Sequence, residues 1–294
     1  MMDRKKLLLL YNPSAGRAQT SRNLDMLLQK FCTGGCETTV YPILDGLNAE
    51  DILAGAESAG YDIVVCCGGD GTLHHTVNGL LRLEQPPLLG YIPSGSTNDF
   101  AASLGLPKTP EDAVVNGRPH AIDAGDFGGE LFCYVAAFGA FSAVSYETPQ
   151  NMKNAMGHLA YIIEGVKRLP IGEKYPARVE VGDQVFEEEF LFCSISNTTS
   201  IGGFSLDKSV EATLDDGEFE VLLIKAPTSV AEANTIVSKL LARDFNNELI
   251  HLLHADSVTV HFPTPTKWTL DGEYGGEHTD VSVQVLANAL HMVF

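Results

Sequence analysis

The stretch Tyr61–Leu80, YDIVVCCGGDGTLHHTVNGL, predicts a strand, a tight turn and a helix in direct succession. Ile63–Cys67 is an uninterrupted apolar run rich in β-branched residues, which is typical of a parallel strand buried on both faces. Three glycines within residues 68–71 then allow the backbone to turn sharply and to expose its N–H groups. From Thr72 onward apolar residues recur at helical spacing, so the turn leads into the N-terminus of a helix.

This turn has the outline of an anion-binding site. N–H groups at a helix start carry partial positive charge, and a glycine turn lets a phosphate approach them closely. Asp70 within the turn would repel a bare phosphate, so it indicates either a Mg²⁺ ion between carboxylate and phosphate or a role in ordering the loop. A tight turn without any ligand has the same local pattern, so the rest of the chain must decide between the two.

Two further loops of this kind occur in the first part of the chain. A strand at Leu7–Tyr11 precedes Asn12–Gly16, and a strand at Leu88–Ile92 precedes Pro93–Phe100. Strands that alternate with helices predict a parallel sheet, whose ligands bind outside the carboxyl ends of the strands. We therefore expect the three loops to converge, which favours a ligand site over three unrelated turns.

The composition indicates a globular protein of about two domains. The chain has 294 residues, which exceeds the commonest domain size, and its apolar fraction of 45% is ordinary. Its 19 basic and 38 acidic residues give a net charge of −19, which argues against nucleic acid as a partner and against bulk attraction to an anionic membrane. We find no apolar run long enough to span a bilayer and no secretory signal, so we expect a cytoplasmic location.

From about Ile122 the pattern changes to strands separated by turns, which predicts an antiparallel sheet or sandwich. The expected strands are residues 131–137, 177–181, 184–196, 218–225 and 257–262, and the expected helices are residues 153–169 and 229–242. Most of the six cysteines lie in apolar, strand-like runs, which indicates reduced core thiols rather than zinc ligands. They are Cys32, Cys36, Cys66, Cys67, Cys133 and Cys193.

Four short motifs occur in an order that points to one family. They are Asn12-Pro13-Ser14-Ala15-Gly16, Gly68-Gly69-Asp70-Gly71-Thr72, Gly95-Ser96-Thr97-Asn98-Asp99-Phe100-Ala101 and Asp271-Gly272-Glu273. In this order the chain resembles, nearly end to end, the diacylglycerol kinase catalytic-domain family, and within it the soluble bacterial lipid kinases. The resemblance implies an α/β plus β fold. Residues 1–122, with 281–294 returning, would form a Rossmann-like α/β nucleotide domain of the NAD kinase and diacylglycerol kinase type. Residues 123–280 would form a C-terminal β-sandwich domain for the lipid.

The resemblance also implies transfer of the γ-phosphate of ATP to a lipid hydroxyl with Mg²⁺ as cofactor. Asp70 and Asp99 match carboxylates near the catalytic metal, and Asp123 matches an acidic residue lining the same cleft. Glu273 matches the proposed general base. The positions that match contacts to ATP are Asn12, Pro13, Ser14, Ala15, Gly16, Gly68, Gly69, Asp70, Gly71, Thr72, Leu73, His74, Ser96, Thr97 and Asn98.

A second, structural Mg²⁺ is implied in the later half of the chain. Asp216 matches one of its ligands, with the backbone carbonyls of Thr213 and Glu218 as companions. Two positions depart from the family pattern in the nucleotide region. The family usually has Asn where His74 stands, and Pro42 and Ile43 occupy the place of its ATP-contacting Thr.

Each of these assignments has a plain structural alternative. Asp271-Gly272 is a common hairpin turn beside which Glu273 would merely be solvated, and Asp215–Gly217 would also serve as a bare turn. His74 and His75 are neighbours in a helix and point apart, so one is expected to pack and the other to face solvent.

The function also has alternatives. An NAD kinase-like phosphotransferase would share the GGDGT loop, and a non-catalytic regulator that binds nucleotide or lipid would keep the fold. The implied partners are a lipid alcohol and a membrane surface that is approached peripherally, while a homodimer is left open. Five basic residues would form either a membrane-facing patch or a solvated face: Lys153, Lys167, Arg168, Lys174 and Arg178.

Overall fold

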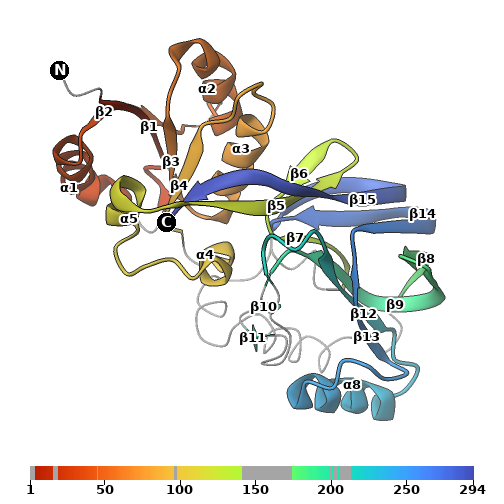
Figure 1. Cartoon of the computed structure of the whole chain (residues 1–294). Coiled ribbons are helices and arrows are strands. Elements are labelled where there is room, and N and C mark those ends of the chain that lie inside the picture. Colours follow the sequence, from red (N-terminus) through yellow and green to blue (C-terminus); the bar gives the residue numbers. More distant parts are fainter. Residues whose placement is uncertain are drawn as a thin grey trace. The chain divides into compact units, whose positions relative to one another are not determined.

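The computed structural model describes residues 4–15, 19–44, 46–95, 98–140, 174–198, 200–201, 204–205 and 213–294 (Figure 1). The chain divides into two compact units, one of Met1–Ile122 with Asn288–Phe294 and one of Asp123–Ala287. This two-domain, mixed α/β organisation confirms the sequence prediction at that level. The helix expected at residues 153–169 and the basic residues Lys153, Lys167 and Arg168 lie outside the described residues.

The first unit contains a parallel sheet with helices between its strands (Figure 1). The strands are ordered β2–β1–β3–β4, and each neighbouring pair runs parallel. The end of β15 (Glu273–Val293) also pairs in parallel with β4, with Met292 opposite Leu89. The other elements are β1 (Lys5–Tyr11), α1 (Gln19–Thr33), β2 (Cys36–Pro42), α2 (Ala49–Ala56), η2 (Glu57–Ala59), β3 (Ile63–Gly68), α3 (Asp70–Leu80), β4 (Leu88–Pro93), α4 (Asp99–Leu104) and α5 (Pro110–Asn116).

The strands of this sheet are apolar along their length because helices cover both faces. Leu7–Leu10 of β1 are buried in succession, and so is every residue of β3. Phe31 of α1 and Val114 of α5 pack on one face, and Figure 1 shows α2 and α3 on the other side of the sheet. A strand covered on both sides has no reason to alternate polar and apolar residues, so continuous apolar runs result.

The second unit is built from antiparallel strands. Strands β8, β9, β7 and β14 pair in a closed circuit, because β9 pairs with both β8 and β7 and β14 pairs with the same two strands. Trp268 and Phe138 lie fully buried at its core, with ring centroids 5.0 Å apart. Strand β5 (Pro119–Phe127) begins in the first unit and ends in the second. The further elements of the second unit are β6 (Glu130–Phe132), β7 (Val135–Gly139), β8 (Tyr175–Val181), β9 (Gln184–Ser196), β10 (Ser200–Ile201), β11 (Phe204–Ser205), β12 (Phe219–Lys225), α8 (Val230–Ala242), β13 (Ile250–Ala255) and β14 (Ser257–Leu270).

Helix α8 covers a second apolar cluster of this unit. Its Ile236 and Leu240 are fully buried and pack with Leu222 and Ile224 of β12. The helix begins at a capped end, because the hydroxyl of Ser229 accepts the N–H of Glu232. Neither this helix nor any other that the structure describes is long and apolar enough to cross a membrane.

One expected strand is divided. The sequence predicted a single strand at residues 131–137, but β6 ends at Phe132 and β7 begins at Val135. The N–H groups of Cys133 and Tyr134 donate to the carboxylate of Asp271 (2.7 and 3.0 Å) instead of to a neighbouring strand. A pattern of apolar residues in the sequence does not show that a distant carboxylate accepts these two N–H groups in place of a strand carbonyl.

The segment that returns to the first unit is shorter than expected. Val281 and Val283 pair antiparallel with Val260 and Val258 of β14, which places them in the second unit. The return begins at Asn288, where the backbone takes a left-handed φ of 54°. The predicted start of the return at residue 281 is therefore too early, because one strand, β15, runs through both units. Its buried residues change from odd positions (Val281, Val283) to even positions (Leu290, Met292) across Asn288.

The cysteines are core residues. All six are free, and all but Cys32 are buried. Burial raises the pKa of Cys66 to about 12 and that of Cys67 to about 11, so both thiols stay protonated near neutral pH.

The burial of α1 gives a first testable prediction. Phe31→Ala should lower the free energy of unfolding by about 3–5 kcal/mol, because it empties a fully buried site between the helix and the sheet. Met26→Ala, on the same helix at 45% exposure, is the matched control and should change stability by less than about 0.5 kcal/mol. Urea denaturation of both variants would check this, and equal losses would contradict the packing described above.

Candidate phosphate and catalytic site

The loops that follow β1, β3 and β4 meet at the carboxyl edge of the parallel sheet. The N–H of Asn12, after β1, donates to the carbonyl of Cys67 in β3 (2.9 Å), and its side-chain amide donates to Thr72 Oγ1 (3.2 Å). The N–H of Ser94, after β4, donates to the carbonyl of Gly68 (2.8 Å). The structure therefore brings together the three loops that the parallel topology was expected to bring together.

Two glycines allow the closest approach between these loops. A Cβ on Gly95 would lie 2.5 Å from the Cα of Gly69, and a Cβ on Gly69 would lie 3.1 Å from the Cα of Gly95. Any side chain at position 95 would push the two backbones apart. Glycine is needed here because two main chains touch, and this is how backbone N–H groups from different loops can face one ligand.

Asp70 and Asp99 are joined by a hydrogen bond between the second and third loops. Asp70 is the first residue of α3, and its Oδ2 accepts the N–H of Asp99 at 3.1 Å. Asn98, at a left-handed φ of 54°, orders the third loop, because its side chain accepts the N–H of Gly95 (2.9 Å) and donates to the same residue's carbonyl (3.0 Å). Two carboxylate-bearing residues thus lie together beside the N-terminus of α3, where a cation and a phosphate would both find partners.

The other residues expected to contact nucleotide differ in their placement. Pro13, Ser14 and Ala15 follow Asn12, whose Oδ1 accepts the N–H of Ser14 (2.9 Å) and so orders the first loop from within. The side chains of Thr72 and Leu73 are buried, and the N–H of Leu73 donates to the carbonyl of Gly69 (3.0 Å), so a contact of these residues to nucleotide stays a prediction. Three of the predicted residues lie outside the part of the chain that the structure describes: Gly16, Ser96 and Thr97.

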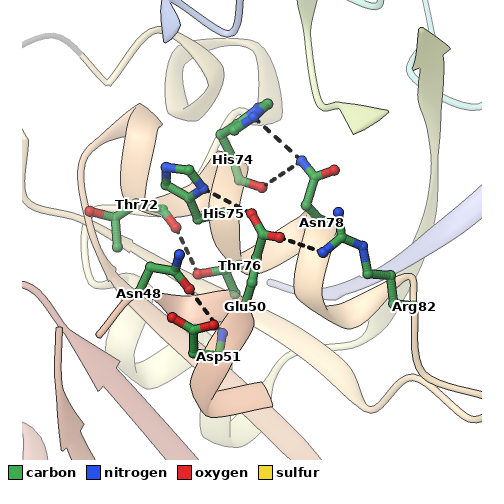
Figure 2. A network of polar contacts seen from close by, with 9 residues as sticks. All are labelled: Asn48, Glu50, Asp51, Thr72, His74, His75, Thr76, Asn78 and Arg82. Carbon is green, nitrogen blue, oxygen red and sulfur yellow. Dashed lines mark hydrogen bonds and ion pairs between the residues drawn. The ribbon is translucent and has the colours of Figure 1, made fainter. Parts of the chain in front are cut away.

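His74 and His75 in α3 have different surroundings (Figure 2). His74 is 3% exposed, and its Nε2 lies 3.5 Å from the side-chain nitrogen of Asn78. His75 Nδ1 lies 3.0 Å from Glu50 Oε1, and the other oxygen of Glu50 binds Arg82 at 2.5 Å. One histidine therefore packs and the other is partly exposed, as expected, and Glu50 joins α2 to α3.

The acidic turn at residues 213–218 in the second unit is closed by Asp123. Asp123 is 1% exposed and its Oδ2 accepts the N–H of Gly217 at 2.7 Å. Asp216 Oδ1 accepts the N–H of Glu218 (3.1 Å), which makes a compact turn. In the described part of the chain no three His, Cys, Asp or Glu side chains gather to hold a metal, so a metal here would need backbone carbonyls. The three predicted ligands are all exposed: Thr213, Asp216 and Glu218.

Two buried residues behind this turn were missed by the sequence analysis. The side-chain amide of Asn197 donates to the carbonyl of Asp123 (2.8 Å). The carboxylate of Glu220 accepts the N–H of Thr198 (3.1 Å), and burial raises the pKa of Glu220 to about 7. The sequence offers one signal for Glu220, which is that this acidic residue interrupts the apolar run of β12.

Glu273 follows a two-residue hairpin turn. Leu270 and Glu273 are paired, and Asp271 and Gly272 between them take left-handed φ values of 51° and 86°. The hairpin alternative is therefore correct for the backbone. Glu273 is exposed, whereas Asp271 is 3% exposed and not a solvated turn residue. The base role of Glu273 stays a prediction.

The chain combines a parallel α/β unit, in which three loops and two carboxylate-bearing residues meet at the carboxyl edge of the sheet, with an antiparallel β unit. This places it in a two-domain α/β plus β class of protein, in which ligands bind at that edge of the parallel sheet. The family model described as the diacylglycerol kinase catalytic domain matches residues 6–127, and that described as the YegS C-terminal NAD kinase β-sandwich-like domain matches residues 135–294.

Individual proteins match over most of the chain. It is 32% identical to a diacylglycerol kinase of Bacillus subtilis, over 92% of this chain and 91% of that protein. It is 34% identical to a diacylglycerol kinase of Staphylococcus saprophyticus, over 93% and 90%. A crystal structure titled as a diacylglycerol kinase from Bacillus anthracis shares the fold, with a TM-score of 0.75 at 20% identity over 100% of this chain and 98% of that chain. The chain belongs to the diacylglycerol kinase family and is a lipid kinase, an activity that implies use of ATP.

The contact between Gly69 and Gly95 gives a second prediction. Gly95→Ala should weaken ATP binding by at least about tenfold, or 1.4 kcal/mol, because the new Cβ forces the two loops apart. Gly55→Ala in α2 is the matched control, since a Cβ there meets nothing within 4 Å, and it should leave binding unchanged. Calorimetric titration with ATP would measure both, and unchanged affinity in Gly95→Ala would remove these loops from the nucleotide site.

Proposed function

We propose that this lipid kinase transfers the γ-phosphate of ATP, with Mg²⁺, to the hydroxyl of diacylglycerol or a related lipid alcohol. The observation that carries the proposal is the hydrogen bond from the N–H of Asp99 to Asp70 Oδ2 (3.1 Å). It joins two of the ordered family motifs at the N-terminus of α3. Relatives that match the chain over about nine tenths of their own length carry the name diacylglycerol kinase.

The nucleotide belongs in this proposal to the Rossmann-like first unit. Phosphoryl transfer depends on positioning and on neutralising charge more than on covalent chemistry. The glycine loops after β3 and β4 provide backbone N–H groups, and the start of α3 adds its dipole. The loop at Asn12 completes the set, because its amide is tied to Thr72 in the same turn.

The carboxylates fit Mg²⁺ by their chemistry. Asp70 and Asp99 offer hard oxygen ligands beside a phosphate-type loop, and Mg²⁺ is bound through one or two carboxylates together with substrate phosphates. When bound there, Mg²⁺ would neutralise the charge of the phosphates. A second, structural Mg²⁺ would use the carboxylate of Asp216 with the carbonyls of Thr213 and Glu218, on the turn that Asp123 closes from beneath.

Glu273 is the group we assign to proton transfer. As the lipid hydroxyl oxygen forms its bond to the γ-phosphorus, the bond from that phosphorus to ADP breaks and the hydroxyl proton passes to the Glu273 carboxylate. The exposure of Glu273 at the first position of β15 is compatible with access by a substrate. Asp123, buried under its turn, is assigned a positioning role for the acidic loop.

The acceptor also determines where the enzyme works. A lipid alcohol lies in a bilayer, so the enzyme must contact a membrane surface peripherally. A net charge of −19 opposes attraction to anionic lipids as a whole, so contact would depend on a local surface.

The function gives a third prediction. With γ-labelled ATP, Mg²⁺ and diacylglycerol in mixed micelles, label should appear in the lipid, and Glu273→Gln should lower kcat by about 10²–10⁴-fold because the base is lost. ATP affinity should stay unchanged in this variant. The kcat is measured from the label in the extracted lipid, and the ATP affinity is measured by calorimetric titration.

Glu277→Gln is the matched control, since Glu277 lies on the same strand, is exposed and pairs with Lys267 at a long distance of 3.9 Å. It should retain wild-type kcat. Transfer of label to NAD in a parallel reaction, or to no acceptor despite ATP binding, would contradict the proposed lipid acceptor.

A further inference from the structure

The turn that precedes Glu273 is held by a side chain from within the turn. Asp271 and Gly272 have φ values of 51° and 86°, which is the left-handed pair that a two-residue hairpin of type I′ requires. Asp enters this region at some cost, and in a bare turn its carboxylate would face water. Here Asp271 is 3% exposed, so its side chain has another role.

The carboxylate of Asp271 accepts three backbone N–H groups from a distant segment. Oδ2 accepts from Cys133 (2.7 Å), and Oδ1 accepts from Tyr134 (3.0 Å) and Val135 (3.2 Å). The N–H of Asp271 in turn donates to the carbonyl of Val135 (2.8 Å). Four hydrogen bonds therefore link the turn to the connection between β6 and β7 and to Val135, the first residue of β7.

The charge of the group fits this environment. An ionised carboxylate only accepts, and three N–H donors with their dipoles compensate a buried negative charge. An asparagine at the same position could keep the left-handed φ, but it would direct an NH₂ group at N–H donors. The set of contacts therefore selects Asp rather than the Asn-Gly that serves a simple hairpin equally well.

The segment to which Asp271 binds is itself held in the sheet, next to β7. Leu270 and Trp268 of β14 pair with Ala136 and Phe138 of β7, directly beyond the segment that Asp271 binds. Glu273 begins the next strand, two residues after Asp271, and its own side chain is exposed. Its Cα position thus depends on the turn, and the turn depends on Asp271.

We infer that Asp271 is the positioning residue for Glu273, fixing the base by anchoring its turn to the β6–β7 connection. The inference rests on the proposed base role of Glu273. A displacement of about 1 Å of a catalytic group can cost about 10²-fold in rate, so loss of the anchor is expected to act on kcat.

The test compares Asp271→Asn in two backgrounds. In the otherwise wild-type enzyme, kcat for lipid phosphorylation should fall about 10–100-fold with the KM for ATP unchanged within about twofold. In a Glu273→Gln background the same substitution should cause no further loss, because the group it positions is already absent. An equal fold-loss in both backgrounds, or no loss in the first, overturns the inference.

Two further variants keep the outcome decisive. If Asp271→Asn does not fold, Gly272→Ala can replace it in the test, because it strains the turn without new contacts: a Cβ there meets nothing within 4 Å. It should lower kcat in the otherwise wild-type enzyme and cause no further loss in the Glu273→Gln background. Asp126→Asn makes the same exchange of carboxylate for amide in another hairpin of the same unit, where Asp126 Oδ1 accepts the N–H of Gly129 (2.6 Å), and it should leave kcat unchanged. If Glu273→Gln alone retains full activity, the proposed base is wrong, which is distinct from a failure of the positioning role.

Discussion

Backbone N–H groups that are shielded from water need an acceptor, and in this protein aspartate carboxylates supply it at three places: the loop after β4, the acidic turn at residues 213–218 and the connection between β6 and β7. Asp70 accepts the N–H of Asp99, 29 residues away, and Asp123 accepts that of Gly217, 94 residues away. Asp271 accepts three, the farthest 138 residues away. Because an unmet buried N–H costs about 1–3 kcal/mol, each of these contacts also fixes the course of the loop it binds.

The local elements of the first unit could be predicted because their causes are local. A short, continuous apolar run between glycines predicts a strand that is covered on both faces. Residues 61–80 alone therefore predict β3 and the loop that follows it. Parallel order then implies that the loops converge, as the bond from Ser94 to Gly68 shows. The order of the motifs also indicated the family correctly. Each motif follows the end of a strand, so the order of the motifs reflects the order of the strands.

The remaining features depend on partners far away in the chain. The break between β6 and β7 follows from the acceptor on Asp271, and Asp271 looked like an ordinary turn residue. The boundary at Asn288 lies inside one long strand, β15. Glu220 is buried where its carboxylate accepts the N–H of Thr198, and no periodicity in the sequence indicates this contact. These features depend on contacts between residues that lie far apart in the chain, and the local sequence pattern does not reveal such contacts.

Short motifs therefore combine residues with different tasks. In Asp271-Gly272-Glu273 the first residue is buried and holds backbone, the second permits the turn, and the third is exposed and available for chemistry. In the loop after β3, Asp70 accepts from Asp99 with one oxygen, so the group that we propose as a Mg²⁺ ligand also ties two loops together. A carboxylate can do both, because each of its two oxygens accepts independently: one can accept a backbone N–H while the other ligates a metal. An ionised carboxylate also has no N–H or O–H group that would point at the metal.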